Sequence, residues 1–205
     1  MCRVASFIVL LSLNSLRTYR ADRYPRPSMT ADIVLLSLEK PVPEVLLVRR
    51  GGHPCLGCWA LPGGFANPEE SVDEAARREL AEETHVEGLP LRQLMLCSAP
   101  GRDPRGWTIS QAYLCVADRS TLAVRADDDA AAACWFQAQY RLEGTRAVLK
   151  LSNESVSMEA ALHFDRRETA CGTVCDLSVL ETGGVAFDHA AMVLRGLLEM
   201  ESICK

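Results

Sequence analysis

Residues 51–70 constrain the fold of this 205-residue chain more than any other segment, because their glycines and prolines interrupt both helical and strand periodicity. The segment reads GGHPCLGCWALPGGFANPEE. Backbone of this composition is expected to be irregular, and long loops are common places for a functional site. The elements on either side of the loop therefore decide what kind of site it can carry.

The elements that flank this loop are a predicted hairpin and a predicted helix. Residues 31–50 contain two apolar, β-branched-rich runs around a proline-containing turn, which favours a β-hairpin. On the other side, Ser71 and Glu74 have the spacing of a capping box, and Asp73 also favours the positive end of a helix dipole. We expect the helix to begin at Ser71, with Asn67 as the second-ranked start.

The rest of the chain predicts more strands and a terminal helix. The strands are expected at residues 91–100, 108–118, 134–137, 145–152, 158–165 and 173–181, the first two of them paired. Residues 187–203 have apolar side chains at helical spacing and offer Asp188 as an N-cap, and residues 4–13 are interpreted as an N-terminal packing helix. We therefore predict one domain over residues 1–205, with a core at about 28–137 and a strand-rich extension with a helix at 138–205.

The composition limits the partners and the compartment. A formal charge of −5 without a long run of lysine or arginine argues against a nucleic-acid partner. Residues 4–13 are too few to span a membrane and lack a clear cleavage site, so we expect neither a membrane partner nor secretion. Nine scattered cysteines fit the reduced thiols of a cytoplasmic protein. The CxxC at Cys55 and Cys58 has no matching second pair, so we interpret it as ordinary rather than as a zinc or redox site.

The predicted helix carries a cluster of acids. Glu79, Glu82 and Glu83 stand at i, i+3 and i+4, so their carboxylates share one face and repel by about 0.2–0.5 kcal/mol per pair. Carboxylate oxygens are suitable ligands for a hard divalent cation such as Mg²⁺, and a bound cation would relieve the repulsion. The spacing alone also fits a solvated helix laced by ion pairs, so the neighbouring residues must decide.

Those neighbours favour the metal site. Gly63 and Gly64 let the backbone approach closely, so that a carbonyl near Gly64 can complete a metal shell. Arg78 can pair with the glutamates four residues before and after it, Glu74 and Glu82, and Glu70 can orient it. A solvated face has no need of the glycine turn, or of Glu70 and Arg78 at these intervals.

Residues 64–86, GFANPEESVDEAARRELAEETHV, resemble the Nudix box, G-x5-E-x7-R-E-U-x-E-E-x-G-U, where U is an aliphatic residue. They match at every defined position except one, where His85 replaces a glycine, and WALPG precedes them. The resemblance implies an α+β fold: an α/β/α sandwich with a mixed β-sheet and a loop–helix–loop catalytic motif. To this the chain adds its strand-rich extension and terminal helix.

The resemblance also implies an activity. Nudix hydrolases depend on Mg²⁺ or Mn²⁺ and cleave a nucleoside diphosphate linked to another moiety, by water attack on phosphorus. Carried onto this chain, the catalytic metal ligands become Glu79, Glu82 and Glu83, with Gly64 beside them. Any one of the three glutamates is a candidate to assist the attacking water. Glu70 and Arg78 become structural supports.

Segments outside the box narrow the substrate. Residues 19–137 and 181–200 resemble the bacterial ADP-ribose pyrophosphatase-like branch, which makes ADP-ribose or a similar nucleotide sugar the expected small-molecule substrate. The candidates to hold phosphate or ribose phosphate are Arg49, Arg102, Asp103 and Arg105. A loop in which Asp103 only pins Arg105 fits the sequence equally well. The alternatives are a pyrophosphatase of (oxidised) nucleoside triphosphates and a non-catalytic ligand-sensing module. Many relatives are homodimers, so a homodimer is a possible state.

Two positions depart from the family pattern. The family's glycine at the position of His85 serves a left-handed residue after the helix, a conformation in which histidine is enriched, so we expect a cost near 1 kcal/mol rather than loss of metal binding. Relatives often carry a carboxylate three residues before Trp135, where this chain has Ala132. The nearest replacements are the aspartates at 127–129, although such a run is more often a solvated loop.

Overall fold

The computed structural model describes residues 19–20, 23–122, 130–170 and 172–203. The strands in these residues are β1 (Ser28–Ser37), β2 (Glu44–Arg50), β3 (Trp59–Ala60), β4 (Gly63–Phe65), β5 (Arg92–Cys97), β6 (Thr108–Val116), β7 (Ala130–Glu143), β8 (Arg146–Ser152), β9 (Ser157–Thr169) and β10 (Gly172–Glu181). The helical segments are α2 (Val72–Thr84), the short 3-10 turn η2 (Arg119–Thr121) and α3 (His189–Ile203).

All the strands join one sheet in the order β10-β9-β8-β7-β2-β1-β6-β5, with β3 attached to β2 and β4 to β1. The predicted hairpin is present, because β1 and β2 pair antiparallel with Leu36 opposite Val45. The predicted pairing of β5 with β6 is also present. The β1 strand runs parallel to β6 while its other neighbours are antiparallel, so the sheet is mixed, as expected.

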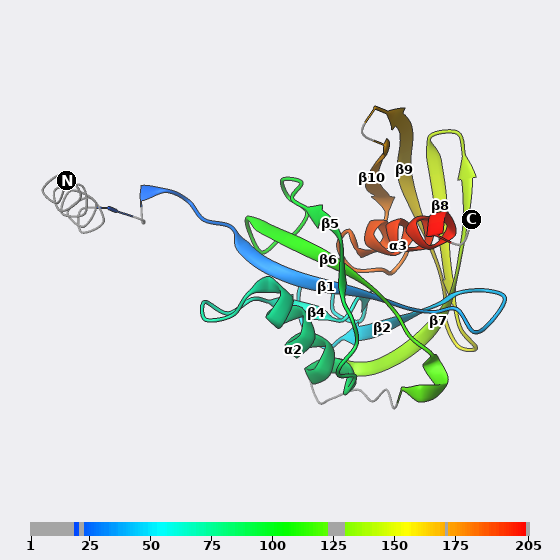
Figure 1. Ribbon diagram of the computed structural model, residues 1–205, viewed down its shortest axis with the longest axis horizontal. Helices are drawn as coiled ribbons and strands as arrows, with labels where there is room; N and C mark the ends of the chain where they lie inside the picture. The colour runs from blue at the N-terminus through cyan, green and yellow to red at the C-terminus, as the bar shows by residue number, and fades with distance from the viewer. Residues whose placement is uncertain (1–18, 21–22, 123–129, 171, 204–205) are drawn as a thin grey trace, which may run out of the picture.

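The central strands of the sheet are buried on both faces, and β1 shows why. Its side chains alternate, so that Ile33 and Leu35 pack with the apolar face of α2, whereas Val34 and Leu36 pack in a second core that includes α3. Figure 1 shows the two helices on opposite sides of the β1 ribbon. A strand buried on both faces reads as a continuous apolar run, which is what residues 33–36 are. The predicted α/β/α layering is confirmed.

Two strand predictions need correction. The loop at 51–70 is not wholly irregular, because it contains the short strands β3 and β4, and β4 pairs with β1 through Gly63 and Gly64. The strand expected at 134–137 is the middle of the much longer β7, which pairs with β2 along its first half and with β8 along its second. Each boundary depends on a partner strand far away in the sequence, which local composition does not reveal.

The C-terminal extension continues the same sheet. The strands β8, β9 and β10 follow β7 as an antiparallel series, and Figure 1 shows them rising beside α3. The strand β7 crosses the proposed boundary at 137/138 without a break, so the core and the extension share one sheet. The assignment of a single domain remains a prediction, and the continuous sheet supports it. The helix predicted at residues 4–13 lies outside the described residues. Within the described part of the chain, no helix is long and apolar enough to cross a membrane.

Candidate functional site

The helix α2 begins where the sequence predicts. Ser71 is its N-cap, its hydroxyl accepts a hydrogen bond from the Glu74 backbone amide, and the Glu74 carboxylate accepts one from the Ser71 amide at 2.8 Å. Ala75, Ala76 and Leu80 are buried against the sheet. This packing orients the helix, so that Glu79 and Glu83 lie beside the glycine-containing strand β4.

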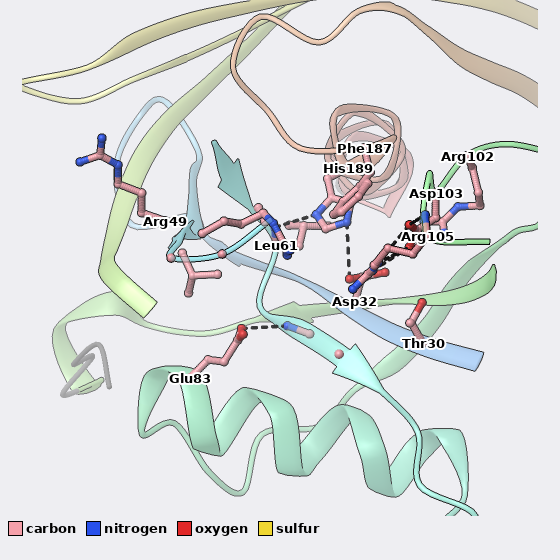
Figure 2. Close-up of a pocket in the computed structure, with 17 residues that line it drawn as sticks. Thr30, Asp32, Arg49, Leu61, Glu83, Arg102, Asp103, Arg105, Phe187 and His189 are labelled. Atoms are coloured by element: carbon pink, nitrogen blue, oxygen red, sulfur yellow. Dashed lines mark hydrogen bonds and ion pairs between the residues drawn. The ribbon is translucent and has the colours of Figure 1, made fainter. Parts of the chain in front are cut away.

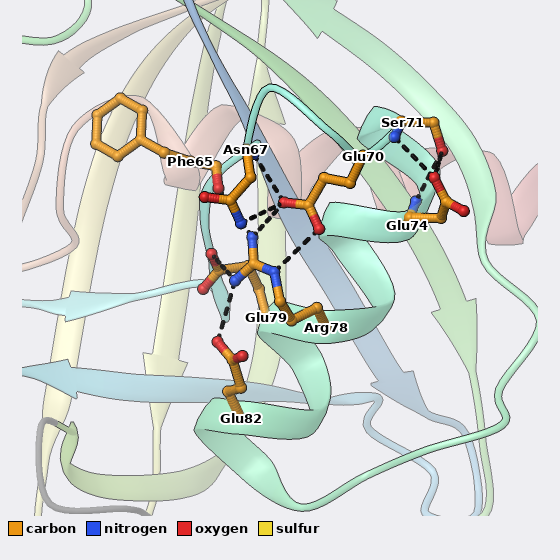
Figure 3. Close-up of polar contacts among 8 residues, drawn as sticks. All are labelled: Phe65, Asn67, Glu70, Ser71, Glu74, Arg78, Glu79 and Glu82. Atoms are coloured by element: carbon orange, nitrogen blue, oxygen red, sulfur yellow. Dashed lines mark hydrogen bonds and ion pairs between the residues drawn. The ribbon is translucent and has the colours of Figure 1, made fainter.

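Arg78 is the centre of an ion-pair network on this helix (Figure 3). Its guanidinium donates to both oxygens of Glu70, at 2.6 and 3.1 Å, and to the Phe65 carbonyl at 2.9 Å. It also donates to Glu79 at 2.7 Å and Glu82 at 3.0 Å. These five contacts use all the donors of a guanidinium, so Arg78 ties the loop before the helix to two of the three acids.

The predicted partners of Arg78 are confirmed with one exception. Glu70 and Glu82 bind it as expected, and Glu79 joins them. The predicted pair with Glu74 is wrong, because that carboxylate is occupied by the Ser71 cap. A carboxylate in the first turn of a helix can accept from the backbone amides that have no partner at the helix end. Glu74 makes this bond rather than one to Arg78, which lies one turn later.

We predict that Glu70→Gln destabilises the fold in a pH-dependent way. Hydrogen bonds from Arg78 and from the Asn67 amide lower the pKa of Glu70 from 4.5 to about 2. A depressed folded-state pKa contributes stability above the ordinary pKa, and this stability is lost as the pH falls towards 2. The melting temperature of Glu70→Gln should therefore lie below that of the parent at neutral pH, and the gap should narrow below about pH 4.5 in thermal unfolding. A gap that is independent of pH would contradict this account.

The two glycines of β4, Gly63 and Gly64, allow the carboxylates of Glu83 and Glu79 to approach the backbone closely. A Cβ atom at Gly64 would lie 2.5 Å from the Glu79 carboxylate, so glycine is what allows that side chain its present position. The Gly63 amide donates to the Glu83 carboxylate at 3.0 Å. At Gly63, where φ is +154°, a Cβ would lie 2.2 Å from the Ala31 carbonyl oxygen. The close backbone approach expected from these glycines is confirmed.

Glu83 lines a cavity of about 160 Å³, which is shown in Figure 2. Burial raises the pKa of Glu83 to about 7, and the charges of Glu79 and Asp32 act in the same direction against the Gly63 hydrogen bond. Burial likewise raises the pKa of Glu79, opposed by Arg78. Both shifts reflect carboxylates crowded into a poorly solvated place, which is where a cation gains most.

The three glutamates thus take different positions. Glu83 points to the cavity, Glu79 lies against Gly64, and Glu82, whose side chain is 60% exposed, rests on Arg78. In the described residues, no three His, Cys, Asp or Glu side chains come together closely enough to hold a metal ion. The donor set is all oxygen and the Gly64 seat admits a carboxylate beside the backbone, so the chemistry fits Mg²⁺ or Mn²⁺. Binding one ion between them requires side-chain rotation at Glu79 and Glu82, which the bonds to Arg78 oppose.

The four residues proposed to bind substrate all line the same cavity: Arg49, Arg102, Asp103 and Arg105. The alternative expectation, that Asp103 pins Arg105, is also met, because the two side chains pair at 2.6 Å. Arg102 is held by both oxygens of Asp188, at 2.6 and 2.8 Å. Asp188 directly precedes α3, as its predicted N-cap position requires, but its carboxylate binds the Arg102 guanidinium. The binding role of these residues remains a prediction.

Among the residues of the cavity wall that were not predicted from the sequence are Asp32, Phe187 and His189. Asp32 is 5% exposed in the middle of β1 and accepts a hydrogen bond from the Ser110 hydroxyl. An acid inside the apolar run ADIVLL was an available signal, because a buried carboxylate needs partners. The other two residues come from just before and at the start of α3, within the segment 181–200 whose resemblance to the ADP-ribose pyrophosphatase-like branch was an available signal.

His85 adopts the left-handed conformation expected of it, with φ 57° and ψ 24°, and its amide donates to the Ala81 carbonyl. We predict that His85→Gly stabilises the fold by about 1 kcal/mol, which raises the melting temperature by about 2–4 °C for a chain of this size. His85→Ala is the control, since alanine shares the backbone strain and should give no rise. A fall in the melting temperature of His85→Gly would show that the imidazole contacts outweigh the strain.

The remaining predictions concern two cysteines and residues whose structure is not described. Cys55 and Cys58 are free thiols, partly buried against the cluster of Val48, Ala60 and Ala186, and their interpretation as ordinary residues stays a prediction. The aspartates at 127–129 and the side chain of Ala132 lie outside the described part of the chain.

Comparisons with known proteins place this geometry in a family. The NUDIX domain model matches residues 27–144. The ADPR responsive transcriptional repressor NtrR of Acinetobacter baylyi is 35% identical over 100 residues, which are 48% of this chain and 40% of the repressor. The ADP-ribose pyrophosphatase of Methanocaldococcus jannaschii is 35% identical over 127 residues, 62% of this chain and 70% of that enzyme.

A solved structure shows the same fold. The MutT/nudix family protein from Enterococcus faecalis has a TM-score of 0.73 and 32% identity, covering 94% of this chain and 69% of that one. The similarity therefore extends over the C-terminal strands and helix, beyond the residues that the domain model matches. With the capped acidic helix, the glycine seat and the Arg78 network in place, the chain belongs to the Nudix family.

Proposed function

We propose that this protein is a divalent-metal-dependent pyrophosphohydrolase that cleaves ADP-ribose or a similar nucleotide sugar. The observation that carries the proposal is the cavity itself, which brings the partly buried Glu83 and the Gly64 seat of Glu79 together with Arg49, Arg102 and Arg105. One wall offers oxygen donors for a cation and the other offers cations for phosphate, as cleavage of a charged diphosphate requires. The similarity to an ADP-ribose pyrophosphatase supports the choice of substrate.

The roles follow from the positions. Glu79, Glu82 and Glu83, with the Gly64 carbonyl, would hold Mg²⁺ or Mn²⁺, which would activate water and neutralise charge on the phosphate oxygens. Glu83 is the one that points to the cavity, so we assign it the place nearest the scissile bond. Arg78 and Glu70 hold the loop and helix in register.

The cavity is smaller than the roughly 300–1,000 Å³ of pockets that enclose a whole drug-sized ligand. We infer that it takes the diphosphate end of the substrate. Arg49 also lines a wider, neighbouring hollow with Trp135 and Arg119, which leaves room for the rest of the nucleotide.

A substrate panel tests the proposal. The purified chain is incubated with ADP-ribose, other nucleotide sugars and normal or oxidised nucleoside triphosphates, in Mg²⁺, Mn²⁺ or EDTA. We expect AMP and ribose 5-phosphate from ADP-ribose, with metal only. Nucleoside monophosphate and pyrophosphate from triphosphates would instead support the triphosphate pyrophosphatase.

A sensing module is the second candidate, favoured by the similarity to the ADPR responsive repressor. It predicts that ADP-ribose binds and is recovered intact in the presence of metal. Compartment, dimerisation and the expected lack of a nucleic-acid partner remain predictions.

A further inference from the structure

Three consecutive residues outside the matched domain contact three separate parts of the cavity wall. The domain match ends at residue 144, yet Phe187 and His189 line the cavity and Asp188 holds Arg102, another residue of its lining. Figure 2 shows the labelled side chains of Phe187 and His189 facing Asp32 and Arg105. We call residues 187–189 the FDH segment.

His189 holds the loop that leads into the glycine seat. Its Nδ1 accepts a hydrogen bond from the Leu61 amide at 2.9 Å, and its Nε2 lies 3.6 Å from the Asp32 carboxylate. The imidazole is 4% exposed, and burial lowers its pKa despite the nearby acids Asp32 and Asp188, with Arg102 and Arg50 adding to the shift. A neutral ring whose Nδ1 accepts must carry its proton on Nε2, facing Asp32.

Asp188 and Phe187 hold the cavity's arginines. The Asp188 carboxylate binds the Arg102 guanidinium through two hydrogen bonds, with the arginine side chain only 5% exposed. The Phe187 ring contacts both Arg50 and Arg105, whose guanidinium carbons are 5.0 and 5.3 Å from its centroid. Phe187 has a φ of 51°, an uncommon conformation for a bulky residue and one that costs energy unless its surroundings hold it.

The backbone beside the FDH segment is joined to the same loop. The Trp59 amide donates to the Gly184 carbonyl, and the Ala186 amide donates to the Trp59 carbonyl at 2.7 Å. A Cβ at Gly183, where φ is +60°, would meet the Glu159 carbonyl at 2.0 Å, so the approach to α3 is tightly packed on β9. The C-terminal extension therefore packs against the residues that precede the FDH segment and helps to fix its position.

We propose that the FDH segment is a positioning element for the Nudix site: His189 sets the Leu61–Gly64 loop, and Asp188 and Phe187 set the arginines that receive the diphosphate. The substrate part of this inference rests on the proposed function. The segment makes site geometry depend on the C-terminal helix, although the metal-ligating glutamates lie more than a hundred residues earlier. Each side chain of the segment holds a different part of the cavity wall. Removing the Asp188 contact should therefore affect ligand binding, whereas removing the His189 contact should affect the loop.

Kinetics and ligand binding test the arginine contacts. We expect Asp188→Asn to raise KM for ADP-ribose and its Kd in EDTA, measured by calorimetry, by about tenfold, with kcat little changed, as for other residues that orient a ligand-binding group. Asp188→Glu should recover part of this loss. The control is Glu199→Gln on the same helix, which pairs with Arg92 and Arg195 away from the cavity and should leave KM unchanged.

Hydrogen exchange tests the loop contact without substrate. In the full chain, His189→Ala removes the acceptor of the Leu61 amide, so peptides covering residues 59–65 should exchange faster, and kcat should fall by about tenfold or more. His189→Asn can present its amide oxygen where Nδ1 stood and should restore slow exchange. Glu199→Gln again serves as the control.

The outcomes separate the two proposals. If the parent protein neither binds nor cleaves ADP-ribose, the substrate assignment fails, while the exchange measurement still decides whether His189 positions the loop. If the parent cleaves ADP-ribose but Asp188→Asn leaves KM and Kd unchanged, the arginine part of the inference is overturned. If His189→Ala exchanges like the parent, or Glu199→Gln like His189→Ala, the loop part is overturned.

Discussion

Glu83→Gln is expected to lower metal-dependent hydrolysis by at least about 100-fold while leaving the fold as stable as before or more so. The amide keeps an oxygen that can accept from Gly63 but removes the charge that is buried beside Asp32 and Glu79. The folded-state pKa of about 7 lies above the ordinary 4.5, so ionisation of Glu83 destabilises the native state as the pH rises through this range. The gain in melting temperature should therefore be larger at pH 8 than at pH 5.

Two companion variants make this result specific. Glu87→Gln, an exposed position just after α2, should change neither activity nor stability. Glu82→Gln should lose hydrolysis without a gain in melting temperature, because its side chain is largely exposed. Full activity in Glu83→Gln, measured with Mg²⁺ and ADP-ribose, would show that the site assignment is wrong, and a large fall in its melting temperature would show that the charge is compensated in the native state.

Gly64→Ala is expected to reduce hydrolysis by about 10–100-fold with little change in stability. The added Cβ would meet the Glu79 carboxylate at 2.5 Å, and that carboxylate is the end of a flexible side chain, which can rotate away. The protein loses its seat for one metal ligand while the sheet and helix remain packed. The rise in melting temperature on addition of Mg²⁺ should also become smaller, because the stabilisation depends on the metal affinity, and calorimetry or a dye-based melt can measure it.

A double-mutant cycle with Glu79→Asp isolates this contact. The shorter acid withdraws its carboxylate from the backbone, so adding Gly64→Ala to Glu79→Asp should cost much less activity than adding it to the parent. Strict additivity of the two losses in log kcat/KM would mean that Gly64 acts through something other than Glu79.

Features that depend on interactions between residues close in the sequence were predictable, and features that depend on distant residues were not. The Ser71 cap, the left-handed His85 and the Arg78 contacts with Glu70 and Glu82 were all predictable, because each depends on spacings of a few residues that a helix fixes by itself. The extent of β7 was not, because a strand ends where its partner ends and that partner is β2, more than eighty residues earlier. The sequence left open whether Arg105 faces a ligand site or pairs with Asp103, and the folded loop brings it to both, because it lines the cavity while its guanidinium binds Asp103.

The sequence by itself therefore determined the family, the acidic helix and the glycine turn, since their signals are local and periodic. Only the tertiary structure decided that Glu83, rather than Glu82, faces the cavity, and that Asp32 and His189 stand beside it. Leu61 and His189 are 128 positions apart, and they meet because β3 pairs with β2 while α3 packs across the opposite face of the same sheet from α2. Such meetings follow from strand register and core packing, which are properties of the whole chain.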